Sequence, residues 1–373
     1  MLITFFADVE DFRRPQGQRY NLSHTLLFSF MAVCCNANTY REISLFIESH
    51  FDKLKYYFHL DWKRAPHFTT IRNHIKGVST QELEGAFRGF TQDLLPSDAF
   101  EGEGYNHIAA DGKVIRRSTD KTENLSAIQS FSFFDVARQL ILGQIQIEEK
   151  TNEIPVFQRL LCNIGIPDAI FTADALHLQK KTFDIAQHNG HKLLIQLKNN
   201  QEQLLEDVQQ VVKLEKPSDI YDEPISKQHG RIEHRKATVF HSRIEDHILD
   251  EIWSRHIKTV ICIERSRDTK NTETNQWKRS KERAFYLSNT KISASYANQL
   301  VREHWGIENK NHYVKDVSFF EDGSRVKKRA FNLAILRSMA LNLFRHYHLN
   351  NIKETRYAFS LDWTLLYSYQ HLL

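Results

Sequence analysis

The chain has 373 residues, of which 41% are hydrophobic and 26% charged, and it contains only 13 Gly and 7 Pro. This composition is typical of a compact globular protein of about two domains, and it excludes collagen-like, low-complexity and disordered sequences. The charge is nearly balanced, with 50 Lys and Arg against 46 Asp and Glu, so the net charge of +4 does not by itself indicate a nucleic-acid partner.

The cysteines and the apolar runs predict the cellular compartment of the protein. The four cysteines form neither a C-x-x-C pair nor a regular disulfide framework, which favours a reducing compartment and argues against a zinc finger. The longest uncharged apolar run, residues 26–35, is about half of the ~20 residues that span a bilayer. The first residues are acidic, unlike a secretory signal. We therefore expect a cytoplasmic protein with no membrane partner.

Residues 1–100 are expected to form a helical domain. Helices are predicted over residues 23–35, 40–50, 51–58 and 79–95. Ser23 is the expected cap of the first helix, and Ser79 with Glu82 has the spacing of a capping box. The preceding segment TTIRNHIKG completes two short helices joined by a tight turn, the form of a helix-turn-helix and equally of an ordinary helical hairpin.

Residues 101–350 form a second predicted domain, in which strands come first and then alternate with helices. The strands are expected at 106–115, 127–135, 139–147, 169–173 and 192–197, and the helices at 153–164, 177–188 and 201–212. The order βββαβαβα is that of a ribonuclease-H-like α/β sheet, with strands 1 and 4 as central neighbours.

A β-rich insertion is expected within that domain, at about residues 217–290. Its strands are predicted at 231–240, 259–264 and 283–288, with a polar, charged loop over Ser266–Lys281. Ser293 then caps a helix toward Trp305, a long amphipathic helix over residues 329–347 closes the core, and residues 351–373 form a C-terminal tail.

Two apolar strands run directly into an aspartate. The sequence HIAADGK ends on Asp111 and FTADA on Asp174. One such Asp most often caps a turn, but two on adjacent central strands lie where open α/β sheets bind their ligands. Because two close carboxylates repel, a cation is expected between them, and Mg²⁺ or Mn²⁺ suits oxygen ligands.

A third acidic ligand is expected on a helix beside the sheet, in or just after the segment REHWGIENKNHYVKD. The acids available there are Glu303, Glu308, Asp316, Glu321 and Asp322, and position alone does not choose among them. Glu308 precedes Lys315 by seven residues, two helical turns. Both would then share one face, the first for metal and the second for a DNA phosphate, although a solvated helix gives the same spacing.

Longer segments carry a more specific pattern. In the N-terminal part these are FADVEDFRRPQGQRYNLSHTLL, NTYREISLFIESH and RAPHFTTIRNHI. Further on they are AADGKVIRRS, FTADALHLQK, LLIQLKNNQ, KQHGRIEHR and REHWGIENKNHYVKDVSFFEDGSRV. Together they resemble the DDE transposases of the H-repeat-associated insertion-sequence family. The resemblance implies a metal-binding catalytic triad of Asp111, Asp174 and Glu308, at intervals of 63 (174 − 111) and 134 (308 − 174) residues.

The resemblance also implies the reaction and its partners. Mg²⁺, with Mn²⁺ as a substitute, would assist hydrolysis of a phosphodiester at each element end, and the freed 3′-hydroxyl would attack target DNA. The partners would be double-stranded DNA, as terminal inverted repeats and as target, and a second copy of the chain when DNA is bound. The related tyrosine-arginine-glutamate-lysine signature is only partly met. Glu308 and Lys315 keep its spacing, but the position four residues before Glu308 is His304 rather than arginine, and Arg302 lies two residues earlier.

Five residues are predicted to contact DNA. Arg302 and Lys315 would hold phosphate near the metal, as would the basic cluster of Lys113 and Arg116. Trp277, beside two basic residues, would stack on an unpaired base. Two alternatives remain open: a structure-selective nuclease on the same fold, and a non-catalytic DNA-binding protein derived from a transposase.

Overall fold

The structure, a computed structural model, divides into two compact units, neither of which is one continuous stretch of sequence. It describes residues 2–101, 104–119, 126–148, 152–228, 230–270, 274–324, 326–327 and 329–369. The first unit comprises residues 1–99, 112–152 and 307–373, and the second residues 100–111 and 153–306.

The N-terminal part of the first unit is helical, as predicted. Its helices are α1 (Leu2–Ala7), α2 (Leu22–Cys34), α3 (Tyr40–Ser49), α4 (Phe51–Tyr57), α5 (Phe68–Gly77) and α6 (Thr80–Leu94). Ser79 caps α6, and its hydroxyl accepts the N–H of Glu82. The expectation that Ser23 caps α2 is wrong. Asn21 does so, because its side chain accepts the N–H of His24 while the Ser23 hydroxyl donates to Asn21 at 2.6 Å.

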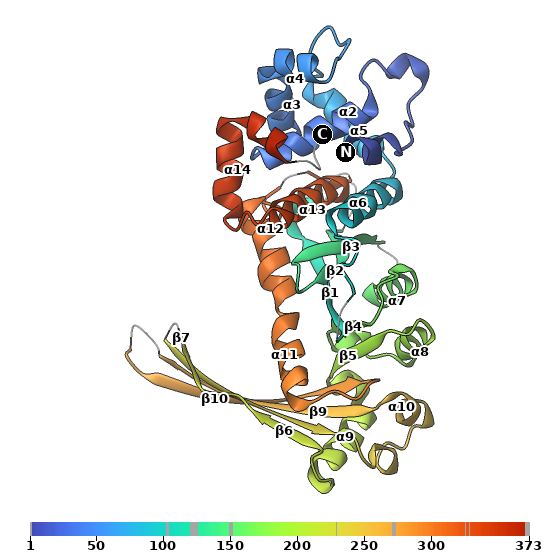
Figure 1. Ribbon diagram of the computed structural model, residues 1–373, viewed down its shortest axis with the longest axis vertical. Coiled ribbons are helices and arrows are strands. Elements are labelled where there is room, and N and C mark those ends of the chain that lie inside the picture. The colour runs from blue at the N-terminus through green and yellow to red at the C-terminus, as the bar shows by residue number, and fades with distance from the viewer. Residues whose placement is uncertain are drawn as a thin grey trace. The chain divides into compact units, whose positions relative to one another are not determined.

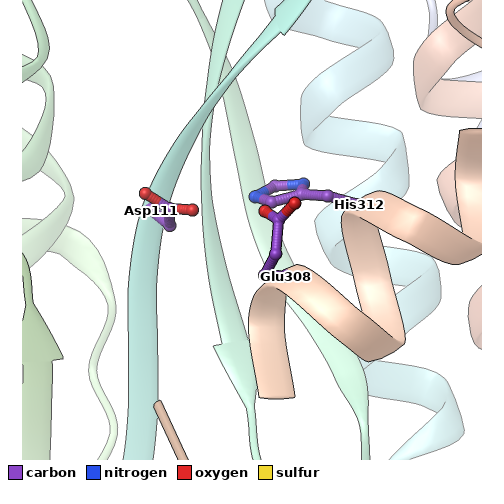
Figure 2. A group of neighbouring side chains, drawn as sticks. All are labelled: Asp111, Glu308 and His312. Carbon is purple, nitrogen blue, oxygen red and sulfur yellow. The ribbon is translucent and has the colours of Figure 1, made fainter. Parts of the chain in front are cut away.

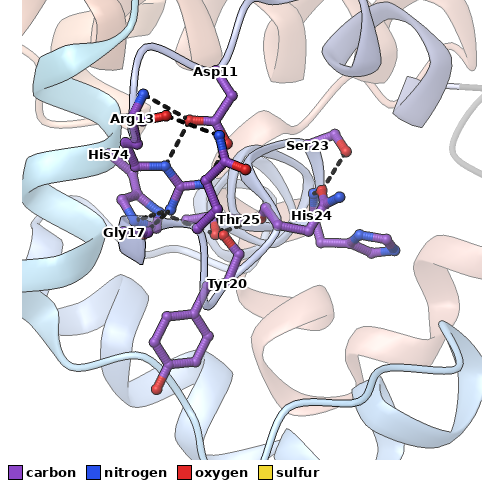
Figure 3. Close-up of polar contacts among 10 residues, drawn as sticks. Asp11, Arg13, Gly17, Tyr20, Ser23, His24, Thr25 and His74 are labelled. Atoms are coloured by element: carbon purple, nitrogen blue, oxygen red, sulfur yellow. Dashed lines mark hydrogen bonds and ion pairs between the residues drawn. The ribbon is translucent and has the colours of Figure 1, made fainter. Parts of the chain in front are cut away.

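Arg13 holds the irregular segment between α1 and α2 in place (Figure 3). Its guanidinium donates to Asp11 at 2.6 and 2.7 Å and to the carbonyl of Tyr20 at 2.8 Å. It also lies 2.6 Å from Nε2 of His74 on α5. Since a guanidinium only donates, this Nε2 accepts, and burial together with the Arg13 charge lowers the pKa of His74 to about 4. The segment is thus tied to α5 by a neutral histidine.

The C-terminal helices of the first unit are α12 (Tyr313–Ser318), α13 (Ala330–His346) and α14 (Ile352–Leu361). Helix α13 packs against α2, α6 and the hairpin of β2 (Ile128–Asp135) and β3 (Leu140–Ile147). The expected amphipathic pattern is wrong, because every residue over 330–344 is buried and both sides of the helix are covered. No helix in the described part of the chain is long and apolar enough to cross a membrane.

The second unit is built on a large mixed sheet. Its strand order is β1-β4-β5-β10-β9-β8-β6, with β7 paired to β8. The strands are β1 (Asn106–Ile115), β4 (Ala169–Ala173), β5 (Lys192–Leu197), β6 (Asp219–Asp222), β7 (Ser226–Gln228), β8 (Arg231–Phe240), β9 (Thr259–Lys270) and β10 (Trp277–Ser288). Strand β1 crosses the unit boundary, since Gly112–Ile115 belong to the first unit. Strands β1, β4 and β5 are parallel, and β10 is antiparallel to β5.

Helices cover both faces of this sheet. They are α7 (Glu153–Asn163), α8 (Lys180–His188), α9 (Glu202–Leu214), α10 (Glu251–His256) and α11 (Ala294–His304). Helix α11 lies on one face, and α7, α8 and α10 lie on the other (Figure 1). Leu300 of α11 packs into a core with Ile170, Leu194 and Ile261 of the sheet. Along the chain the elements follow the predicted order of three strands and then alternating helices and strands.

Strands β9 and β10 continue as a long antiparallel ribbon (Figure 1). The expected loop over Ser266–Lys281 is therefore wrong for residues 266–270 and 277–281, which are strand; residues 274–276 are outside the strands as expected, and residues 271–273 lie outside the described residues. Charged residues are compatible with strand here because they pair across the ribbon, as Arg279 does with Asp268 at 2.8 Å. Trp277 begins β10 opposite Lys270.

Candidate active site

Asp111 and Asp174 belong to two adjacent parallel strands of the second unit: Asp111 lies within β1, two residues past its last pairing with β4, and Asp174 directly follows β4. Strand β1 pairs with β4 in a register in which Asn106 faces Ala169 and Ala109 faces Thr172. Each pair is 63 residues apart (169 − 106), and the same interval separates Asp111 from Asp174 (174 − 111). Continued two residues past the last pair, Ala109 and Thr172, this register would bring the two aspartates opposite each other. This end of a parallel sheet is where ligands bind in open α/β folds.

The surroundings of Asp174 show that the two carboxylates interact. Burial raises the pKa of Asp174, and the negative charge of Asp111 raises it further, while His177 lowers it. Nε2 of His177 lies 3.8 Å from Asp174 and 3.7 Å from Glu153. Asp174 also accepts the N–H of Leu176 at 3.2 Å, which is the capping role expected of a lone Asp. A divalent cation would offset the like charges of the pair.

A buried polar chain joins α11 to both of these strands. His107 on β1 contacts Glu303 through Nδ1 at 3.2 Å and the Thr172 hydroxyl on β4 through Nε2 at 2.9 Å. The same hydroxyl contacts Nδ1 of His304 at 2.9 Å. Burial, with smaller contributions from neighbouring charges, lowers the pKa of His304 to about 4, so His304 is neutral in this contact at neutral pH. Hydrogen bonds therefore fix the end of α11, at His304, three residues before Ile307.

The sequence analysis names Glu303 and His304 but overlooks His107 and Thr172. A signal for them existed, because His107 and Asp111 are four residues apart on β1 and Thr172 and Asp174 are two apart at the end of β4. Alternation along a strand places residues at even spacing on one face. A polar residue at even spacing from a predicted catalytic Asp is thus a candidate supporting group.

The structure separates Glu308 from the other acids of its segment. Glu303 contacts His107, Asp316 and Glu321 contact Lys113, and Asp322 lies 3.4 Å from Arg116. Glu308 is exposed and pairs with no lysine or arginine among the described residues. It belongs to the π-helical segment Ile307–His312, shown with Asp111 on β1 in Figure 2. His312 of this segment offers a ring nitrogen within 4.8 Å of the Glu308 carboxylate, which makes it a further possible ligand.

Lys113 is the centre of a buried ion cluster in the first unit. Its ammonium donates to Glu321 at 2.8 Å, to Asp316, and to the carbonyl of His312 at 3.3 Å. Burial would lower the pKa of Lys113, but the nearby carboxylates outweigh it and the pKa is raised. Lys113 thus ties the end of β1 to α12 and to the segment that carries Glu308.

Lys315 belongs to the same cluster. Its side chain is completely buried, 4.0 Å from Glu321, and burial lowers its pKa to about 8. The expectation that Glu308 and Lys315 share one face is therefore wrong, since Glu308 is exposed. The i→i+5 hydrogen bonds of a π-helix widen the turn, so a spacing of seven residues no longer brings two side chains to one face. The predicted phosphate contact of Lys113 and Lys315 stays a prediction; in the structure Lys113 is bound by carboxylates, and Lys315 is buried 4.0 Å from Glu321.

The burial of Lys315 affects the predicted stability of the protein and its pH dependence. Its ammonium has no hydrogen-bond partner, so Lys315→Met should leave the protein at least as stable as the wild type. Because the folded pKa of about 8 lies below the ordinary 10.5, the wild type should gain stability as the pH rises from 8 toward 10.5. Lys315→Met should lose this gain, as measured by urea unfolding at neutral and at alkaline pH. A variant much less stable than the wild type at neutral pH would contradict the prediction.

The remaining predicted DNA contacts lie at the surface. Arg302 pairs with Glu223, within the second unit. Arg116 has 83% of its side chain exposed despite its contact with Asp322. Trp277 is 53% exposed at the start of β10. Of these three, Trp277 is the one with no polar partner to displace.

Comparison with known families assigns the chain. Residues 102–343 match the family described as "Transposase DDE domain", and residues 3–91 match the family "DDE_Tnp_1-associated". The chain belongs to the DDE transposases. The predicted resemblance to H-repeat-associated transposases is thereby confirmed.

The relatives of this DDE transposase carry similar descriptions. "H repeat-associated putative transposase YhhI" of Escherichia coli is 28% identical, over 92% of this chain and 89% of the relative. "H repeat-associated putative transposase YbfD" of the same organism is 29% identical, over 67% of this chain and 96% of the relative. A solved piggyBac transposase synaptic complex with hairpin DNA matches with a TM-score of 0.45 and 10% identity, covering 100% of this chain and 78% of that one.

Proposed function

We propose that this transposase cuts DNA at the ends of an insertion sequence and joins the freed ends to target DNA. The observation that supports the proposal is the parallel register of β1 and β4, whose continuation would bring Asp111 opposite Asp174 where parallel sheets bind their ligands. A transposase needs acidic ligands at such a position, because they would hold the divalent cations that offset the negative charge of its phosphodiester substrate.

The proposed catalytic and metal-binding triad is Asp111, Asp174 and Glu308. Asp111 is the last residue of the second unit before the chain enters the first unit at Gly112. Glu308 is the second residue after the chain re-enters the first unit at Ile307. Both acids therefore stand at covalent junctions of the two units. The three carboxylates are hard oxygen ligands, which fit Mg²⁺ or Mn²⁺, and bound divalent ions would activate water and stabilise the leaving oxygen.

The reaction would proceed in two steps, a hydrolysis and a transesterification. In the first, a water oxygen bonds to the phosphorus at the element end, the bond from phosphorus to the 3′-oxygen breaks, and a 3′-hydroxyl is released. In the second, that 3′-oxygen attacks a phosphorus of target DNA, and the target's own 3′-oxygen leaves. Asp111, Asp174 and Glu308 would hold the divalent ions, which would supply charge stabilisation of the reacting phosphate, and no covalent bond to the protein would form.

The fold is proposed to be ribonuclease-H-like. The order β1-β2-β3-α7-β4-α8-β5-α9 and the parallel pairing of β1, β4 and β5 support this. Strands β6 to β10 would be an insertion between α9 and α11. Residues 1–100 would grip the terminal inverted repeats, two copies would pair the two ends, and the protein would act on DNA in the bacterial cytoplasm.

Arg116, Arg302 and Trp277 are the proposed surface contacts to DNA. Arg116 and Arg302 would exchange their carboxylate partners for phosphate oxygens, which bind a guanidinium equally well. Trp277 would stack on an exposed base.

The test is nicking, in the presence of Mn²⁺, of a plasmid that carries the element's own flanking DNA. The wild type should cut at the element ends, and Asp111→Asn, Asp174→Asn and Glu308→Gln should each reduce cutting to background. Equal cutting by all four proteins would refute the triad. Triad-dependent cutting without preference for the ends would favour the nuclease alternative. Binding of the ends without any cutting would favour the non-catalytic DNA-binding protein.

A further inference from the structure

The first unit contains a cavity of about 640 Å³ whose lining carries positive charge. It lies between the end of α6, the turn from β2 to β3, the segment that carries Glu308, and the end of α13. Its charged lining residues are Arg138, Lys310 and Arg345, with two histidines, and no Asp or Glu lines it. Clefts lined by one sign of charge concentrate ligands of the opposite sign.

Two of these cations have no carboxylate to neutralise them. Arg345 donates to the carbonyl of Gln139 at 2.5 Å and lies 5.4 Å from the centre of the Phe134 ring, and burial lowers its pKa to about 9. Lys310 is exposed and pairs with no acid among the described residues. Arg138, by contrast, binds Asp135 at 2.9 Å. A net positive charge therefore remains at Lys310 and Arg345.

The rest of the lining is apolar or carries amides. Leu94, Leu140 and Ile352 contribute apolar surface, and Asn309 and Asn350 contribute groups that both donate and accept hydrogen bonds. The volume falls within the roughly 300–1,000 Å³ of sites that bind small molecules. A lone phosphate would fill little of this space, whereas a phosphate with its attached nucleoside matches both kinds of lining.

We propose that this cavity binds a nucleotide unit, with its phosphate at Lys310 and Arg345 and its base or sugar against the apolar wall. Two sources share this chemistry, a DNA strand and a free nucleotide. Lys310 follows Glu308 by two residues in the sequence, so a DNA strand held by the proposed triad would pass close to Lys310. The DNA source rests on the proposed function.

The experiment compares the full-length wild type with Lys310→Gln and with Lys310→Gln/His348→Asn. Both positions are exposed, and His348 has a positive φ, which Asn tolerates, so neither change should disturb folding. Lys213→Gln, at an exposed lysine of the second unit, is the matched control. The probes are a fluorescein-labelled single strand and a duplex of the same mixed sequence, titrated over a range of KCl concentrations. Deoxyadenosine monophosphate is titrated separately by calorimetry.

The double variant should bind DNA roughly tenfold more weakly than the wild type. The slope of its log affinity against log salt concentration should be shallower by about one, since one phosphate contact is lost. Lys213→Gln should stay within about twofold of the wild type. Loss of deoxyadenosine monophosphate binding alone, with DNA binding unchanged, would assign the cavity to a free nucleotide. Unchanged binding of both probes would overturn the proposal. If the wild type binds no DNA, the proposed function fails separately, and the calorimetry alone decides the cavity.

Discussion

Replacing Asp111 with Asn should lower Mn²⁺ affinity more than ~100-fold, since even the outer hydrogen-bond partners of metal ligands are worth 10–100-fold. The protein should nevertheless stay folded. The charge of Asp111 contributes to the raised pKa of Asp174, so the two carboxylates repel when no cation separates them. Without metal, Asp111→Asn should therefore unfold at the same urea concentration as the wild type or a higher one. Calorimetric titration with MnCl₂ and urea unfolding in a chelator measure the two effects.

Glu303→Gln is the matched control for this prediction. Glu303 lies in the same stretch as Glu308, but it contacts His107 and Gln299 within the second unit. Its loss should leave Mn²⁺ affinity within a few-fold of the wild type. Equal Mn²⁺ affinity in Asp111→Asn and the wild type, or an equal loss in Glu303→Gln, would show that Asp111 is not a ligand.

The central strands could be predicted from sequence because their pattern is local. Strands β1 and β4 occur over the predicted residues, since an apolar run identifies each of them; β4 ends directly before Asp174, whereas β1 continues through Asp111 to Ile115. The ribbon beyond Glu264 could not be predicted in this way. The side chains of Arg265 and Asp268 bind Glu282 and Arg279 across the strand pair, and these partners are distant in sequence. In a single-sequence reading, a charged strand without alternation resembles a loop.

The first two acids of the candidate site follow from local pattern, but the third does not. The segment after α11 holds several acids, and the difference between them is which cation each one meets. Lys113, which takes up Asp316 and Glu321, lies 203 and 208 residues earlier in the chain. The π-helical turn adds a second obstacle, because its wider turn breaks the 3.6-residue spacing used to compare Glu308 with Lys315.

Replacing Glu321 with Gln should destabilise the protein by about 3–5 kcal/mol, the usual cost of removing one partner from a buried ion pair. Glu321 is completely buried, and its loss would leave Lys113, Lys315 and Arg337 with Asp316 as the remaining acid of the cluster. Burial would raise the pKa of Glu321, but the charges of these three cations outweigh it and lower the pKa to about 2. Urea unfolding at neutral pH measures the loss.

Asp322→Asn is the control, because this neighbouring acid pairs with the exposed Arg116 and should cost ~1 kcal/mol or less. The pH dependence separates the two further. A depressed carboxyl pKa stabilises fully above its ordinary value of 4.5, and this stability is lost as the pH falls from 4.5 toward about 2. Glu321→Gln should lack that part of the acid-induced loss, and Asp322→Asn should keep it. Identical unfolding of the two variants would mean that the buried cluster does not hold β1 to α12. The effect expected for Lys315→Met is opposite in sign to that of Glu321→Gln, because the cluster has more cations than acids.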